Sequence, residues 1–147
     1  MEIAILGLGC FWGPEIKFSK LDGVIKTEVG YCGGNSSETT YKEVCTGTTN
    51  HAEVVKLDFD PKIISYEEIL KYFFKIHDPT TLNSQGPDFG TQYRSEIFYF
   101  NDQQKEISEK IIKEENIKFS GKIVTKVSLV KNYCPAEEYH QKYLEKR

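Results

Sequence analysis

Cys10 is the residue with the clearest chemical potential, because it stands between an apolar run and a segment with the features of a helix start. Pro14 suits the first helical turn, where no backbone N–H is needed, and Glu15 suits the positive end of the helix dipole. A cysteine at such a position is biased toward the thiolate, since unsatisfied N–H groups favour negative charge there. With Phe11 and Trp12 beside it, the thiol predicts a small pocket that holds an apolar group.

Two other interpretations of this stretch are open. A free cysteine is often no more than a small buried apolar residue. Gly7 and Gly9, at a strand-to-helix turn, are similar to the glycines of a dinucleotide-binding fingerprint, but that fingerprint needs a third glycine where this chain has Trp12. The nucleotide interpretation is therefore weak.

Glu53 is the acid best suited to proton transfer. On the predicted strand Ala52–Phe59 its side chain shares a face with three apolar residues, Val55, Leu57 and Phe59. A carboxyl group on the core-facing side loses hydration, which raises its pKa and lets it hold a proton near neutral pH. The alternative is that Glu53, near the first residue of the strand, turns out to solvent.

The elements that position these groups follow from the hydrophobic pattern. The predicted strands are Glu2–Leu8, Val24–Tyr31, Ala52–Phe59, Ser95–Phe100 and Ile123–Val130. The predicted helices follow Pro14, run over Tyr66–His77, run from Gln103 to about Asn116, and close the chain from Ala136. Ser65 and Glu68 form a capping-box pattern ahead of the second helix.

Two long stretches, Gly33–Asn50 and Asp78–Arg94, hold no predicted element. Loops of that length in a compact domain are usually functional or disordered, so we expect them to form the walls of an active site. Strands and helices in mixed order predict an α+β fold. The expected architecture is a single domain over residues 1–147, a two-layer sandwich whose mixed sheet carries flanking helices.

The composition excludes several classes of protein. The 147 residues, 39% hydrophobic and 28% charged, are ordinary for one soluble globular domain. A net charge of −3, with lysines scattered among acids, argues against a nucleic-acid partner. No apolar run approaches the ~18 residues of a membrane span, and the N-terminus lacks the pattern of a signal peptide. We therefore expect a cytoplasmic protein with no membrane partner.

The Gly-Cys-Phe-Trp-Gly motif at positions 9–13 is the first of a series. The other motifs are Gly-Tyr-Cys-Gly-Gly at 30–34, Tyr-Lys-Glu-Val-Cys-Thr-Gly at 41–47, Asn-His-Ala-Glu at 50–53, His-Asp-Pro-Thr-Thr at 77–81, Gln-Gly-Pro-Asp-Phe-Gly-Thr-Gln-Tyr-Arg-Ser at 85–95 and Ala-Glu-Glu-Tyr-His-Gln at 136–141. In this order they resemble the A-type peptide methionine sulfoxide reductases over essentially the whole chain. The resemblance implies thiol-dependent reduction of the S epimer of methionine sulfoxide, free or in proteins. We expect no cofactor, and no metal, because the four cysteines lack the C-x-x-C pairing of a zinc site.

The resemblance also implies a role for individual residues. Cys10 is the nucleophile and Glu53 the acid, while Phe11 and Trp12 hold the methyl group of the substrate. Tyr41 and Tyr93 match two hydroxyls that bond the sulfoxide oxygen, although each is one of nine tyrosines and core filler is the ordinary role of such a residue.

Three polar residues keep a structural alternative. Asp88 matches an acid that orients the hydrogen-bond network, but it also suits a turn between a proline and a glycine. His140 matches a C-terminal histidine of the family, and a satisfied core histidine is an equal alternative. His77 lies on an apolar stripe and is expected to be structural.

Recycling is the step that the sequence leaves open. The mechanism oxidises Cys10 to a sulfenic acid, which a second thiol must reduce. Relatives usually carry resolving cysteines in a glycine-rich tail beyond the Tyr-His-Gln segment, and this sequence shows none there. Cys134 and Cys32 are the candidate resolving residues, with a slight preference for Cys134, and Cys45 matches a cysteine not used in turnover. Alternatively thioredoxin, glutaredoxin or a small thiol reduces Cys10 directly, and we expect a monomer.

Two rival classes of protein remain. One is a cysteine hydrolase that uses Cys10 with His51 or His140 as its base. The other is a non-enzymatic module that binds methionine through Phe11 and Trp12. A hydrolase consumes no reductant, and a binding module tolerates alkylation of Cys10, so a turnover assay separates both from a reductase.

Overall fold

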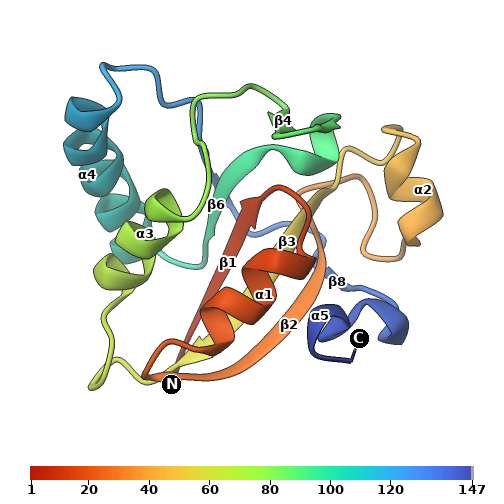
Figure 1. The fold of residues 1–147 in the computed structure, drawn as a ribbon, viewed down its shortest axis with the longest axis horizontal. Coiled ribbons are helices and arrows are strands. Elements are labelled where there is room, and N and C mark those ends of the chain that lie inside the picture. Colours follow the sequence, from red (N-terminus) through yellow and green to blue (C-terminus); the bar gives the residue numbers. More distant parts are fainter. Residues whose placement is uncertain (147) are drawn as a thin grey trace.

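A computed structural model describes residues 1–146 as one α+β domain built on a six-stranded sheet (Figure 1). Its strands are β1 (Glu2–Leu8), β2 (Val24–Cys32), β3 (Ala52–Phe59), β6 (Ser95–Tyr99), β7 (Lys126–Leu129) and β8 (Cys134–Pro135). They are arranged in the order β7-β6-β1-β3-β2-β8. All neighbours pair antiparallel except β6 and β7, which are parallel, so the sheet is mixed as expected.

The remaining elements are helices and one small hairpin. The helices are α1 (Trp12–Ser19), α2 (Tyr41–Cys45), α3 (Tyr66–Lys75), α4 (Asp102–Lys118) and α5 (Tyr143–Lys146), with 3₁₀ turns η1 (Thr91–Tyr93) and η2 (Glu138–His140). The hairpin pairs β4 (Ser84–Gln85) with β5 (Asp88–Phe89). No helix in the described range is long and apolar enough to cross a membrane.

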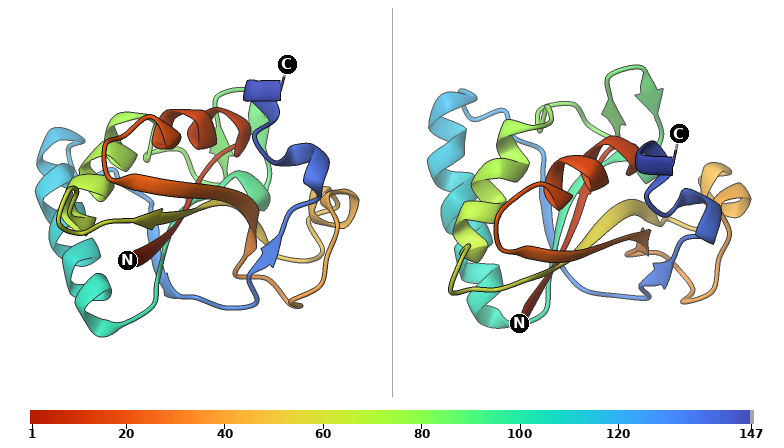
Figure 2. Two further views of the ribbon diagram at one scale, coloured as in Figure 1. Left: turned by 90° about the horizontal axis from the view of Figure 1, so that it is seen from below. Right: turned by 60° about the horizontal axis from the view of Figure 1, so that its bottom comes forward.

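The three longest helices, α1, α3 and α4, pack on one face of the sheet (Figure 2). Phe18 of α1, Phe73 of α3 and Ile111 of α4 belong to the same buried cluster as Leu57 of β3. The opposite face carries a smaller cluster around Phe98, covered by the segment after β7. This arrangement confirms the predicted two-layer sandwich, because burying one face of a sheet under helices already supplies a sufficient core.

The capping box ahead of α3 is confirmed. Ser65 Oγ accepts a hydrogen bond from the backbone N–H of Glu68, and the Glu68 carboxylate accepts one from the Ser65 N–H. Two donors that the helix itself leaves unpaired are thereby satisfied. α3 ends at Lys75, and His77, two residues later, bonds the Phe73 carbonyl through Nδ1 and Ser95 Oγ through Nε2. His77 therefore joins α3 to β6, in agreement with its expected structural place.

The prediction of one closing helix from Ala136 is wrong, because the segment forms two separate elements, η2 and α5. Between them the Gln141 side chain accepts from the Val29 N–H and donates to the Val29 carbonyl. The backbone N–H of Lys142 donates to the buried carboxylate of Glu15 at 2.7 Å, and Lys142 has a positive φ of 51°. These tertiary bonds to β2 and α1 replace the backbone ladder of a continuous helix.

Two further expectations need correction. The predicted strand Ile123–Val130 shrinks to β7, an edge strand, whose last residue, Leu129, is 58% exposed. The two long stretches are not structureless: Gly33–Asn50 contains α2, and Asp78–Arg94 contains the β4-β5 hairpin and η1. Elements this short carry too little periodicity to be recognised in a sequence.

Candidate active site

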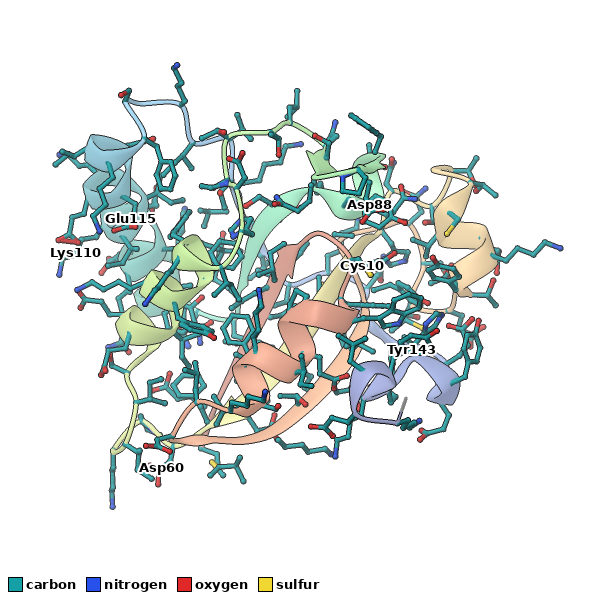
Figure 3. The ribbon with its side chains drawn as sticks, viewed as in Figure 1. Cys10, Asp60, Asp88, Lys110, Glu115 and Tyr143 are labelled. Atoms are coloured by element: carbon teal, nitrogen blue, oxygen red, sulfur yellow. The ribbon has the colours of Figure 1, made fainter. Side chains whose placement is uncertain are left out.

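Cys10 lies at the junction between β1 and α1, on a chain turn that Gly9 makes with a φ of 100°. Its thiol is half-buried, and Asp88, whose charge acts on it, lies near it in the view of Figure 3. Glu53, the second residue of β3, points into the same region: its Oε1 accepts a hydrogen bond from the Phe11 N–H at 3.3 Å. Glu53 is only 1% exposed, which confirms that it faces the core rather than the solvent.

Burial raises the pKa of Glu53 to about 8. The hydrogen bond from Phe11 acts in the opposite direction, and the nearby charge of Asp88 adds to the rise. Among the described residues the Oε2 atom of Glu53 is buried without a hydrogen-bond partner. A carboxyl group in this state holds its proton at neutral pH and has it ready for an acceptor.

The expectation of a Cys10 thiolate is wrong for the resting protein. Burial raises the pKa of Cys10 to about 11, and the charges of Glu53 and Asp88 act in the same direction. The Trp12 N–H lowers the pKa, which is the helix-start effect that the sequence indicates, but it is the smaller influence. Desolvation outweighs the helix terminus here, so the resting group is a thiol.

Tyr41 and Tyr93 approach Glu53 from the two long stretches. Tyr41 is the first residue of α2, and Tyr93 is the last residue of η1. Burial raises the pKa of each hydroxyl, and the charge of Glu53 raises both further. The Tyr41 hydroxyl also bonds the Tyr93 hydroxyl and lowers the pKa of Tyr93. The tertiary structure therefore gathers two hydroxyl donors around one carboxyl group.

Asp88 is the first residue of β5 and pairs with Gln85 of β4 next to the hairpin turn. Its charge raises the pKa of Cys10, of Glu53 and of Tyr93, which places it among these groups. The Gln85 side chain holds the hairpin in place, because it bonds the Asp78 backbone through both its oxygen and its nitrogen. Asp88 thus serves a turn and the site at the same time.

The aromatic pair beside Cys10 is divided between core and surface. Phe11 is 1% exposed and packs against Tyr31 with ring centres 5.8 Å apart. Trp12 is partly exposed and stacks on Tyr143 at 4.0 Å with an angle of 13° between the rings. Its Nε1 donates to His140 Nδ1 at 3.1 Å. Stacking and hydrogen bonding together fix the orientation of the indole ring.

The contacts of His51 and His140 bear on the hydrolase alternative, in which one of them would act as the base for Cys10. Both ring nitrogens of His51 are engaged, with the Gly34 N–H at 3.1 Å and the Ser36 carbonyl at 2.7 Å, so His51 braces a loop instead of activating a thiol. His140 is 2% exposed, and burial lowers its pKa. Its Nδ1 accepts the Trp12 N–H, and its Nε2 is buried without a partner among the described residues. His140 thus orients the indole ring.

All four cysteines are free thiols, and the sheet separates the two candidate resolving residues. Cys32 belongs to the small cluster on the face of the sheet opposite to α1, where its Sγ bonds the Lys131 carbonyl. Cys134 pairs in register with Tyr31, which in turn pairs with Glu53. Directly paired residues of antiparallel strands point to the same face. Cys134 therefore shares the face of Glu53, whereas Cys32 would have to cross the sheet to reach Cys10.

Sequence reasoning missed three polar residues that hold the C-terminal segment against the site. Glu15 accepts a hydrogen bond from Lys142, and Gln141 accepts one from Val29. Glu137 accepts hydrogen bonds from Tyr31 and Tyr41. The only available signal was their place within or near the recognised motifs, since local spacing does not show a contact between residues that lie 96 to 127 positions apart.

A half-buried thiol, a protonated carboxyl group and two tyrosine hydroxyls on an α+β domain define a thiol-dependent enzyme that supplies a proton to its substrate. The family model described as peptide methionine sulfoxide reductase matches residues 2–147. A protein of Pelagibacter ubique (strain HTCC1062) named peptide methionine sulfoxide reductase MsrA is 82% identical over the full length of both chains. This chain belongs to the A-type peptide methionine sulfoxide reductase family and is an oxidoreductase.

More distant relatives agree with this assignment. A protein of the same name from Methanothermobacter thermautotrophicus is 52% identical and is matched over 99% of this chain and 87% of its own length. The crystal structure of reduced Mxr1 from Saccharomyces cerevisiae superposes with a TM-score of 0.96 at 44% identity, over 99% of this chain and 85% of Mxr1. A structure of Mxr1 in complex with Trx2 superposes with a TM-score of 0.70 at 29% identity, over 97% and 84%.

Proposed function

We propose that this enzyme reduces the S epimer of methionine sulfoxide, free or within proteins, and so repairs oxidised proteins. Family membership supports the reaction, and the description of the family model names a peptide substrate. The observation that carries the mechanism is the buried carboxyl group of Glu53, whose pKa of about 8 keeps it protonated beside Cys10. Reduction of a sulfoxide needs such a donor, because the oxygen must accept a proton as its bond to sulfur breaks.

In the proposed first step, the Cys10 sulfur attacks the sulfur of the sulfoxide while Glu53 delivers its proton to the oxygen. Tyr41 and Tyr93 hold that oxygen with their hydroxyl groups. As the S–O bond of the substrate breaks, the protonated oxygen bonds to the Cys10 sulfur and the transient bond between the two sulfur atoms breaks. The substrate sulfur gains two electrons, the Cys10 sulfur loses two, and the proton of the Cys10 thiol passes to the Glu53 carboxylate. The products are methionine and a sulfenic acid on Cys10, the first reversible product of thiol oxidation.

The proton on Glu53 also favours the reactive form of Cys10. The charge of Glu53 is one of the causes that raise the pKa of the thiol. When Glu53 holds its proton this charge is absent, so the Cys10 pKa moves down toward neutral pH. One proton therefore serves both partners of the reaction.

The substrate methyl group is expected to lie against Trp12, at the outer side of the site. The indole ring is held by Tyr143 and His140 and cannot turn freely. Phe11, being fully buried, supports this wall from within. An apolar wall of fixed orientation recognises a methyl group by contact and leaves the polar oxygen to the hydroxyls.

In the second step a thiol attacks the sulfenic acid, water leaves, and a disulfide to Cys10 forms. Cys134 is the internal candidate, because it shares the face of Glu53. Thioredoxin is the proposed final reductant, and the solved complex of yeast Mxr1 with Trx2 supports it. The free thiols suit a reducing compartment, so we propose a cytoplasmic enzyme, to be tested by fractionation. The expected monomeric state stays a prediction, to be tested by light scattering.

The test is a single-turnover assay on the S and R epimers of a methionine sulfoxide peptide, without recycling reductant. Cys10→Ser should abolish methionine formation while circular dichroism shows an intact fold, since a serine hydroxyl is too weakly acidic to attack sulfur. Glu53→Gln should slow formation by about 10²- to 10⁴-fold, the usual contribution of a general acid. Glu138→Gln is the control, because Glu138 is 90% exposed and, among residues 1–146, forms an ion pair only with the surface residue Lys146.

The outcomes separate the rivals. Methionine formation by Cys10→Ser at more than a few per cent of the parent rate would show that Cys10 is not the nucleophile. An unchanged rate in Glu53→Gln would mean that another group protonates the oxygen. Hydrolysis of the peptide without oxidation of a protein thiol would favour the cysteine hydrolase. Binding of the peptide by the parent protein without formation of methionine would favour the binding module.

A further inference from the structure

The Glu137 carboxylate joins three tyrosines that come from distant parts of the chain. Its Oε1 accepts the Tyr31 hydroxyl at 2.9 Å, and its Oε2 accepts the backbone N–H of Tyr41 at 2.9 Å and the Tyr139 hydroxyl at 3.3 Å. Although burial raises the pKa of Glu137, the hydrogen bonds from Tyr41 and Tyr31 hold it below its usual range. The group is an anion at neutral pH, and its bonds are charge-assisted and strong.

The bond to the Tyr41 N–H fixes the first residue of α2. This helix has only five residues and lies in the long stretch between β2 and β3. Besides Glu137, the buried Val44 and the partly buried ring of Tyr41 attach it to the core. A short helix held at few points can shift as a body, and the Tyr41 hydroxyl would move with it. A tight bond at the Tyr41 backbone therefore fixes the base of the side chain that carries this hydroxyl.

The other contacts of Glu137 lead to the same site. Tyr31 is fully buried, contacts Phe11, and pairs in register with Glu53. The Glu137 carboxylate thus links the Tyr41 backbone to the paired strands β2 and β3, the second of which carries Glu53. His140, three residues after Glu137, contacts the Tyr41 ring at 4.5 Å between ring centres, so backbone and ring are held from one segment.

We propose that Glu137 is a positioning residue, which acts through Tyr41 to place its hydroxyl at the sulfoxide oxygen. This inference rests on the proposed function of Tyr41. Glu137 itself touches neither the substrate nor the reacting sulfur. Its loss should therefore lower the rate of the reductive step only as far as Tyr41 contributes to it.

The experiment is a double-mutant cycle on the full chain with Glu137→Ala and Tyr41→Phe, read by the single-turnover rate on the S epimer. Each single variant should be about tenfold slower than the parent. The double variant should also be about tenfold slower, because a residue that acts through the Tyr41 hydroxyl has no effect once that hydroxyl is gone. Independent effects would multiply to about a hundredfold loss and would overturn the proposal.

A conservative variant and a matched control exclude a general loss of stability. In Glu137→Gln the amide oxygen can accept the Tyr41 N–H while the amide nitrogen donates to the Tyr31 hydroxyl, which is free to rotate. This variant should stay within about threefold of the parent rate. Glu138→Ala, at the neighbouring exposed position, should be unchanged. A tenfold loss in Glu138→Ala would assign the effect to the segment as a whole and reject a specific role of Glu137.

Hydrogen exchange gives a readout that does not depend on the reaction. The Tyr41 amide should exchange faster in Glu137→Ala and at the parent rate in Glu137→Gln. Unchanged exchange in Glu137→Ala would show that Glu137 does not hold Tyr41. If instead Tyr41→Phe alone leaves the reductive rate unchanged, the proposed role of Tyr41 fails, and exchange still decides whether Glu137 holds its backbone.

Discussion

Ionisation of Glu53 should destabilise the folded enzyme, and Glu53→Gln should remove this cost. The pKa of Glu53 rises from 4.5 to about 8 on folding. Each tenfold change in proton affinity corresponds to about 1.4 kcal/mol, so the full cost of ionising the folded state is about 5 kcal/mol. Glu53 is 1% exposed, so solvent screening does not reduce this figure appreciably.

The sign follows from proton binding. Between pH 4.5 and about 8 the folded state holds a proton on Glu53 that the unfolded state has lost. Stability contributed by this group is therefore present at low pH and is lost as the pH rises through that window. Most of the loss falls between pH 5 and pH 9.

The assay is urea unfolding of the parent, Glu53→Gln and Glu138→Gln at pH 5 and pH 9. In Glu53→Gln the new amide oxygen can still accept the Phe11 N–H, and the amide nitrogen takes the place of an oxygen that already lacks a partner. Any cost of the buried amide is the same at both pH values and cancels. The parent and Glu138→Gln should lose about 4 kcal/mol more than Glu53→Gln between the two pH values. Parallel losses in all three proteins would refute a perturbed Glu53.

Three further outcomes are expected. The rate of Cys10 alkylation by iodoacetamide, followed on its tryptic peptide, should rise about tenfold per pH unit from pH 7 to 9 without levelling. In Glu53→Gln this rate should reach its plateau at a lower pH, because the variant lacks the carboxylate charge that raises the thiol pKa. Mass spectrometry after one equivalent of sulfoxide without reductant should show a Cys10–Cys134 link; a Cys10–Cys32 link would contradict the separation by the sheet. Ser65→Ala should destabilise the protein by about 1 kcal/mol in urea unfolding through loss of the capping box, and an unchanged midpoint would count against it.

Features of this protein that depend on neighbours along the chain could be predicted from the sequence. The bounds of β1 and β3 match the hydrophobic pattern, and α3 starts at the residue that its capping box indicates. The inward direction of Glu53 follows from the two-residue period of a strand. Periodicity and caps are local, so one chain is enough to recognise them. The motifs likewise indicated the family.

The tertiary structure alone decided how distant residues meet. The pairing of β8 with β2 puts Cys134 on the face of Glu53 and leaves Cys32 behind the sheet. Burial, to which the charge of Asp88 adds, turned the expected Cys10 thiolate into a thiol. Contacts of Glu137 with Tyr41, 96 residues away, are invisible in any local pattern. The physical reason is common to these cases: a pKa, a strand partner or a long-range hydrogen bond depends on everything that surrounds a group in space, and sequence spacing describes only its neighbours along the chain.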